Sequence, residues 1–491
     1  MAQKKMHPAK TFLALLATML ALFGIMAAFP VDGIEIGSIK FQFPNAEEFF
    51  EDIDPMKTES ERELTHLLED TTIILTTADS LKMHQKLDSI KEAKKKLQFV
   101  DASNPSLSKF FEVLQMARQR KVRVMHFGDS QIEGDRITGY LRNKLQTEFT
   151  GFGGGLFPIV PVAPQLFVNI NYSENWKRYS GFGKKDSTVK HMKYGALMSF
   201  SRFAPIEPSD TAEYEGWVTI RKPHKSYGRT KTYHQLKVYY GNVKGTVTYQ
   251  VWVDGDLRIS DTLLTGALLG DIFLEMENTP EEIKIEFKGN DSPDIYGISL
   301  EGNTGVVMDN IPLRGSSGTI FKRQDRALLQ SMFTELKPSL ILLEFGGNTV
   351  PYINGQEECL NYGNWFKAQI KLLKRMNPEA AIILIGPSDM ASKIKTEYRT
   401  RTYLPYVRDV LKQAAMESNC VFWDMYEAMG GLNSMIKWVK AEPPLAAKDY
   451  THFTPKGAKK IASLFYQQLM EKHEDYNMNK TNTVVHNTIK K

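Results

Sequence analysis

The chain has 491 residues, of which 42% are hydrophobic and 24% are charged, as in globular proteins and unlike disordered ones. The net charge of +5, from 62 basic and 57 acidic residues, is too small to indicate nucleic-acid binding. Only two cysteines occur, which excludes a disulfide framework. A chain of this length predicts more than one domain and a large core.

An uncharged apolar segment near the N-terminus predicts a membrane-spanning helix. Residues 11–29 contain no charged side chain and are long enough to cross a bilayer as a helix. Three lysines precede this segment: Lys4, Lys5 and Lys10. They favour a cytoplasmic tail over 1–10 and a single-pass anchor over 11–30 in the inner membrane, with the remaining chain on the periplasmic or extracytoplasmic side. A cleaved signal peptide is the alternative, although residues 25–28 offer a poor cleavage site.

Residues 31–100 are predicted to form a helical stalk between the membrane and the folded body. The stretch 31–55 is acidic and irregular, whereas 58–97 is rich in lysine, glutamate and other helix-favouring residues. Such a run of charges is most simply a solvated helix face. At the other end of the chain, 476–491 is predicted to be a polar tail.

The first informative motif is His-Phe-Gly-Asp-Ser-Gln-Ile-Glu-Gly over residues 126–134. It follows an apolar strand and precedes a helix predicted over 137–149, so Gly128 and Asp129 would form the turn that presents Ser130. A serine on such a turn is accessible and lies near free helix amides, where acyl-transfer chemistry needs a nucleophile. The alternative is an ordinary Asp/Ser helix cap.

A second motif supplies the base that a serine nucleophile requires. Asp449 and His452 stand three residues apart, just before a helix that is predicted to start at Thr454-Pro455. A carboxylate at this spacing orients the imidazole, which can then accept the proton of Ser130. A solvated surface pair is the alternative, and it is disfavoured by the upstream serine motif.

Two further residues are candidates for stabilising an oxyanion. Gly315 lies in a glycine- and serine-rich turn, and Asn348 follows an apolar strand predicted over 341–345. Together with the backbone amide of Ser130, a glycine amide and an asparagine side chain would place three donors around one oxygen. Taken singly, each residue also fits an ordinary turn or loop.

In the order Ser130, Gly315, Asn348 and His452, the chain resembles the SGNH hydrolase (GDSL-type esterase) superfamily, whose four motif blocks contribute these residue types. The first block is close to the family form, with Gly134 completing Gly-Asp-Ser-x-x-x-Gly. The third block departs from it, because Gly-x-Asn-Asp is replaced by Gly-Gly-Asn-Thr. No Gly-x-Ser-x-Gly elbow surrounds the serine, which argues against an ordinary α/β-hydrolase.

The resemblance implies an α/β fold, namely a flavodoxin-like SGNH three-layer sandwich around a parallel sheet. It covers two segments, 101–165 and 301–475, and strands alternate with helices in the second one. Between them, 166–300 shows period-2 strands separated by turns and predicts an inserted β-sandwich domain.

The same resemblance, closest to peptidoglycan O-acetylesterases with an inserted carbohydrate-binding-like domain, implies the activity. It predicts a membrane-anchored, exported serine esterase that removes O-acetyl groups from an acetylated polysaccharide or peptidoglycan. An O-acetyltransferase using the same residues is one alternative, and an inactive glycan-binding scaffold is another. The intact serine, aspartate and histidine argue against the scaffold. Aromatic residues of the inserted segment are candidates for stacking on sugars, or else core residues: Trp217, Tyr239, Tyr240 and Trp252.

No cofactor and no metal site are predicted, and no nucleic-acid partner. Cys359, expected in a loop, and Cys420, expected before a strand, have no neighbouring histidine or cysteine at ligand spacing. One disulfide or two free buried thiols both fit the pattern. The identity of the acyl group and the oligomeric state are left open by the sequence.

Overall fold

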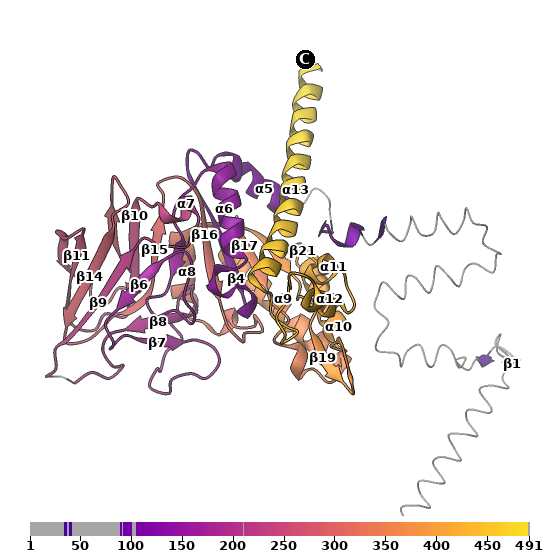
Figure 1. Cartoon of the computed structure of the whole chain (residues 1–491), viewed down its shortest axis with the longest axis horizontal. Helices are drawn as coiled ribbons and strands as arrows, with labels where there is room; N and C mark the ends of the chain where they lie inside the picture. Colours follow the sequence, from indigo (N-terminus) through magenta and orange to yellow (C-terminus); the bar gives the residue numbers. More distant parts are fainter. Residues whose placement is uncertain are drawn as a thin grey trace, which may run out of the picture. The chain divides into compact units, whose positions relative to one another are not determined.

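The computed structural model describes 34–36, 39–41, 89–90, 92–100, 105–209 and 211–489 (Figure 1). The described residues from 89 onward form one compact unit, and the strands β1 (Ile34–Ile36) and β2 (Ile39–Phe41) belong to another. The predicted anchor over 11–30 lies outside the described residues. None of the described helices combines the length and the apolar character needed to cross a bilayer.

A six-stranded sheet holds the two sequence segments together. Its order is β16 (Gly305–Pro312), β4 (Lys121–Gly128), β17 (Pro338–Glu344), β18 (Ala381–Ile385), β21 (Val421–Trp423) and β3 (Leu97–Gln98). Each neighbouring pair is parallel except the pair formed by the edge strand β3. Taken in chain order from β4, the parallel strands follow the flavodoxin-like arrangement 2-1-3-4-5, whose topological switch point lies between β4 and β17.

Helices cover both faces of this sheet, which gives the predicted three-layer sandwich. One face packs against α5 (Pro105–Gln115), α6 (Thr138–Phe149) and α13 (Pro455–Ile489), and the other against α8 (Arg326–Leu336), α9 (Gln356–Met376) and α10 (Leu404–Glu417). Alternation along β4 explains this, because Val122 and Val124 join the first hydrophobic cluster while Met125 and Phe127 join the second. Shorter helices complete the layers: α11 (Met425–Met429), α12 (Ser434–Lys440), η2 (Phe321–Arg323) and η3 (Val350–Tyr352).

Two antiparallel sheets are built from the chain between β4 and β16. The first contains β13 (Gly270–Glu275), β10 (Gln235–Gly241), β15 (Asp294–Glu301), β8 (Ser199–Arg202), β7 (Lys177–Ser180) and β5 (Gly155–Phe157). The second contains β12 (Asp256–Thr262), β11 (Val247–Val253), β14 (Glu282–Gly289), β9 (Tyr214–Arg221) and β6 (Asn169–Tyr172). Alternate residues of both sheets share one buried cluster, as in a β-sandwich.

The antiparallel sheets begin before the predicted range 166–300, because β5, which ends at residue 157, pairs with β15. The far face of β10 and β15 contributes Tyr239 and Tyr296 to the same hydrophobic cluster as α8. The two antiparallel sheets therefore share a core with the parallel sheet's helices, and the separate inserted domain stays a prediction. A short helix, α7 (Gly228–Lys231), lies between β9 and β10.

Two local expectations were wrong. Within the predicted stalk, β1 and β2 pair as antiparallel strands, and the alternation Ile34-Glu35-Ile36 before Gly37-Ser38 is the signal that favours strands there. Cys359 lies in α9 and not in a loop, because it falls on the buried face of that helix. Cys359 and Cys420 are both free and buried, and burial raises the pKa of each thiol to about 11.

Candidate active site

Ser130 lies at the topological switch point, immediately after β4. Between β4 and α6, which matches the helix predicted over 137–149, the chain forms a short 3₁₀ helix, η1 (Ser130–Asp135). The Asp129 carboxylate caps this turn by accepting the Gln131 backbone N–H at 2.9 Å. The left-handed backbone at Gly134 (φ 63°) and Asp135 (φ 64°) then ends the turn, which is why α6 starts only at residue 138. Asp129 is thus a helix cap as well as part of the serine motif.

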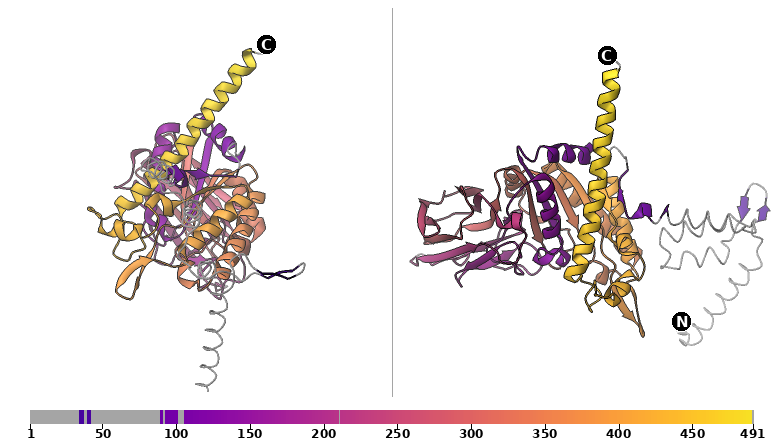
Figure 2. Two further views of the ribbon diagram at one scale, coloured as in Figure 1. Left: turned by 90° about the vertical axis from the view of Figure 1, so that its right-hand side faces the viewer. Right: turned by 45° about the horizontal axis from the view of Figure 1, so that its top comes forward.

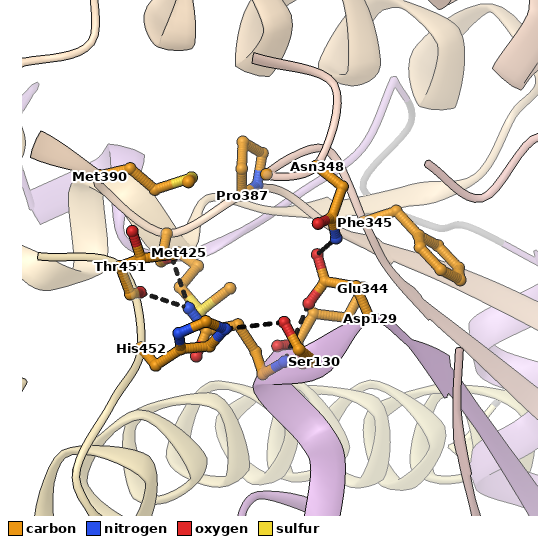
Figure 3. Close-up of a pocket in the computed structure, with 13 residues that line it drawn as sticks. Asp129, Ser130, Glu344, Phe345, Asn348, Pro387, Met390, Met425, Thr451 and His452 are labelled. Atoms are coloured by element: carbon orange, nitrogen blue, oxygen red, sulfur yellow. Dashed lines mark hydrogen bonds between the residues drawn. The ribbon is translucent and has the colours of Figure 1, made fainter. Parts of the chain in front are cut away.

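The three residues predicted to be catalytic form one hydrogen-bonded chain. Ser130 Oγ lies 2.8 Å from His452 Nε2 (Figure 3). On the other side of the ring, His452 Nδ1 lies 2.8 Å from Asp449 Oδ2. An ionised carboxylate accepts the Nδ1–H proton, so Nε2 is left to accept the proton of Ser130. The geometry is that of a nucleophile, a general base and an orienting carboxylate.

The Asp449 carboxylate is held in its charged form by local donors. Partial burial opposes ionisation, but three donors outweigh it and lower the pKa of this carboxyl. They are the backbone N–H of His452 at 3.0 Å, the backbone N–H of Thr451 at 2.9 Å, and the His452 ring. The short turn over 449–452 therefore fixes the histidine tautomer by itself.

Two residues that were not predicted to belong to the site form hydrogen bonds between the turn at Ser130 and the loop that carries His452. Gln131 donates to the Thr451 carbonyl at 2.7 Å and accepts the Phe453 backbone N–H at 3.4 Å. Arg136 donates to the Ser130 carbonyl and, at 3.4 Å, to the Phe453 carbonyl. No spacing in the sequence connects 131 or 136 with 451–453, so only the folded chain could show these contacts.

Of the two predicted oxyanion donors beyond Ser130, Asn348 lines the pocket and Gly315 does not. Asn348 lies beside Ser130 in the same pocket, and its amide Nδ2 donates to Asp129 Oδ2 at 2.9 Å and to the Ser316 carbonyl at 3.4 Å. An oxyanion would replace the longer of these two bonds. Gly315 has a left-handed backbone (φ 77°) and does not line the pocket, whereas Gly347 does. The oxyanion role of Gly315 thus receives no geometric support.

Replacing Asn348 with alanine is expected to lower kcat by about 10²–10³ and to change KM little, because the amide meets the oxygen only as charge develops on it. Steady-state kinetics on a small acetyl ester would measure this effect. Asn354→Ala, just beyond η3, is the matched control, since the exposed Asn354 side chain donates to the nearby Tyr352 carbonyl at 3.3 Å. A rise in KM at unchanged kcat would contradict the assignment.

The Asp129 carboxyl, between Ser130 and Asn348, has an unusual proton affinity. Burial, assisted by the neighbouring Glu344 carboxylate, raises its pKa to about 7, against the hydrogen bonds from Gln131 and Asn348. An aspartate of an unfolded chain takes up its proton near pH 4 instead, at about 3.9. Between these two values the folded state binds more protons, so this carboxyl makes the free energy of unfolding fall as pH rises.

Asp129→Asn should remove that titration. The loss of stability between about pH 5 and about pH 7.5 should then be smaller than in the wild type by roughly 1–3 kcal/mol. Urea unfolding at both pH values would measure it, with the exposed Asp256→Asn on β12 as a control that keeps the wild-type dependence. If the free energy of unfolding of Asp129→Asn changed with pH as it does in the wild type, the raised pKa of the Asp129 carboxyl would be refuted.

The pocket around Ser130 is small. Its volume is about 90 Å³. It is lined by Asp129, Ser130, Gln131, Glu344, Phe345, Gly347, Asn348, Pro387, Ser388, Met390, Met425, Thr451 and His452 (Figure 3). Polar groups gather on the serine side, and Pro387, Met390 and Met425 supply apolar surface. Such a cavity accommodates a small acyl group beside the nucleophile.

The aromatic residues named for sugar stacking divide into two groups. Tyr239 and Tyr240 are core residues, exposed by only 1% and 5%. Trp217 is exposed on β9, and Trp252 is half-buried on β11. The core interpretation therefore holds for the two tyrosines. Among the described residues, no group of three or more His, Cys, Asp or Glu side chains is arranged to hold a metal ion.

Comparison with known proteins supports the predicted resemblance. Residues 288–460 match the family model described as the GDSL-like Lipase/Acylhydrolase family. The matched range contains Asn348, Asp449 and His452 but not Ser130, which lies before the antiparallel sheets. No curated protein matches the sequence.

One of the similar solved structures shows the same fold. A peptidoglycan O-acetylesterase superposes with a TM-score of 0.58 at 18% identity, covering 77% of this chain and 99% of that one. A family two carbohydrate esterase from Clostridium thermocellum in complex with cellohexaose gives a TM-score of 0.25 at 10% identity, covering 60% of this chain and 98% of that one. An acetyl xylan esterase, AlAXEase, gives 0.26 at 15% identity, covering 33% and 80%. Only the first superposition is close enough to support the fold.

Proposed function

Because this chain carries a GDSL-type (SGNH) esterase domain, we propose that it is a serine esterase that removes O-acetyl groups from a cell-envelope or extracellular carbohydrate. The observation that carries the proposal is the continuous chain of 2.8 Å hydrogen bonds from Ser130 through His452 to Asp449. This arrangement also disfavours the alternative of an inactive scaffold, which has no need of an aligned base.

The proposed reaction uses groups that already face one another. His452 Nε2 accepts the Ser130 proton while Oγ attacks the ester carbonyl carbon, and the oxyanion is held by the Ser130 backbone N–H and the Asn348 amide. His452 then gives its proton to the departing sugar oxygen as the C–O bond breaks, leaving acetyl-Ser130. Water then attacks this ester and passes a proton to His452, which gives that proton to Ser130 Oγ as the bond between Oγ and the acyl carbon breaks. Acetic acid leaves and ionises to acetate, and the free serine and neutral histidine are restored.

The choice of acyl group and substrate class has two supports. The pocket of about 90 Å³, with Met390 and Met425 on its apolar side, suits an acetyl group better than a long acyl chain. The fold shared with a peptidoglycan O-acetylesterase favours a carbohydrate ester. We further propose that residues 11–30 anchor the enzyme in the inner membrane, with the esterase on the periplasmic or extracytoplasmic side.

The pocket offers a sharp test of the nucleophile, because it contains two serines, Ser130 and Ser388. Only Ser130 bonds a histidine, so a fluorophosphonate probe should modify the peptide that contains Ser130 and leave the peptide with Ser388 unmodified, as read by mass spectrometry. The full chain should also release acetate from acetylated xylan. Absence of both labelling and acetate would refute the proposal.

Acetyl transfer with the same residues is the second candidate, and it differs only in the acceptor. Adding a soluble oligosaccharide acceptor to the acetate-release reaction separates the two. A hydrolase yields free acetate at a rate that is independent of the acceptor. A transferase yields the acetylated oligosaccharide in its place.

A further inference from the structure

A β-hairpin rises directly from the rim of the active-site pocket. It consists of β19 (Ala391–Ile394) and β20 (Glu397–Thr400), and it projects from the lower edge of the molecule in Figure 1 and again in Figure 2. Met390, at its base, lines the pocket. The Ala391 backbone N–H donates to the Tyr450 carbonyl at 3.0 Å, which joins the base to the turn that carries His452.

The hairpin carries an aromatic pair beside this turn. The rings of Tyr398 and Tyr450 are stacked, with centroids 3.7 Å apart and an angle of 12° between their planes. Tyr450 directly precedes the pocket residue Thr451, and it has a left-handed backbone (φ 56°). Each ring covers one face of the other, yet Tyr398 remains 40% exposed. An open tyrosine face with a polar tip suits the apolar C–H face of a sugar ring.

The same hairpin is cationic. Between residues 391 and 400 it has three exposed basic side chains, Lys393, Lys395 and Arg399, and one carboxylate, Glu397, which pairs with Arg399 at 3.1 Å. Lys393 is the register partner of Tyr398, and directly opposed residues of an antiparallel pair share one face. A positive charge thus stands next to the open aromatic ring, where it favours a ligand with carboxylates.

We propose that the hairpin is a substrate-binding arm, on which Tyr398 stacks against a sugar ring next to the acetylated one while Lys393 and Lys395 attract carboxylates of the glycan. The inference rests on the proposed esterase function and narrows its substrate to an anionic, O-acetylated glycan. The chemistry at Ser130 is unchanged by it, since the arm acts on a part of the substrate that does not react.

The test compares three substrates with the full chain: a small acetyl ester, O-acetylated hexagalacturonate and O-acetylated xylohexaose, the last being neutral. Tyr398→Ala should lower kcat/KM for the galacturonate roughly tenfold relative to kcat/KM for the small ester, the change that one lost aromatic contact brings. The matched control is Tyr227→Ala, since Tyr227 is also 40% exposed but lies at the start of α7. If Tyr398 only supported the histidine turn, all three substrates would suffer equally, and the proposal would be overturned.

A second comparison tests the charge. The double variant Lys393→Glu, Lys395→Glu should lose the preference for hexagalacturonate over xylohexaose, and added salt should weaken that preference in the wild type. The control is the double variant Lys184→Glu, Lys185→Glu, which makes the same change in net charge on another exposed loop. This variant should keep the wild-type preference for hexagalacturonate. Equal handling of both glycans by the wild type would overturn the anionic assignment.

The same measurements distinguish a wrong esterase assignment from a wrong role for the hairpin. A wild-type protein that hydrolyses none of the three substrates refutes the esterase. If the wild-type protein hydrolyses them and the hairpin variants leave the ratios of kcat/KM between the substrates unchanged, only the role of the hairpin as a substrate-binding arm is refuted.

Discussion

Ser130→Ala is expected to reduce turnover of a small acetyl ester by about 10⁴-fold or more, because no other group in the pocket bonds the base at His452. The loss should be one of chemistry and not of folding. The hydrogen bonds that hold the serine turn are made by the side chains of Asp129, Gln131 and Arg136, and the substitution removes none of them. Circular dichroism and urea unfolding should therefore match the wild type.

The control for this variant is Ser463→Ala, which removes an exposed hydroxyl from the outer surface of α13. It should retain wild-type turnover. If Ser130→Ala also kept near wild-type turnover, the acyl-serine mechanism would be wrong, whatever the fold.

Asp449→Asn is expected to lower kcat by roughly 10³–10⁴ with little change in KM. The asparagine oxygen can still accept the backbone N–H groups of Thr451 and His452, which the carboxylate accepts now at 2.9 and 3.0 Å, so the turn should persist. Its amide nitrogen, however, would donate toward Nδ1 of the histidine. The ring proton would then move to Nε2, which could no longer accept the proton of Ser130.

The control for this variant is Asp475→Asn on α13, which removes an exposed carboxylate that forms a local ion pair with Lys472. That variant should keep wild-type kcat. A loss in Asp449→Asn of less than about tenfold would mean that the turn orients His452 without its carboxylate.

The candidate catalytic residues could be identified from the sequence because each lies in a short local pattern. Ser130 follows an apolar strand, and Asp449 and His452 share one turn before a helix, so chain-local signals were enough. Gln131 could not be found in this way, since its role depends on the Thr451 carbonyl, 320 residues further along. The hydrogen bond from Asn348 to Asp129 was missed for the same reason, at a separation of 219 residues.

The fold shows the same division. Alternation of strands and helices after residue 301 predicts the parallel sheet, because every helix there has its own apolar face. The 3₁₀ turn after Ser130 was missed, since it depends on a left-handed Asp135, which is next to Gly134 but is not itself a glycine. The role of Gly315 stays a prediction, because a glycine in a turn specifies backbone freedom and says nothing about which cavity it borders.

The order of the strands has a consequence for how this protein acquires its activity. The strand before Ser130, β4, finds its two sheet neighbours only in β16 and β17, and His452, the base proposed for Ser130, lies 322 residues downstream. Contacts of such high sequence separation form late and slowly. With the roles proposed above, a growing chain carries Ser130 for most of its synthesis without its base, and ester hydrolysis is expected to begin only after His452 has docked.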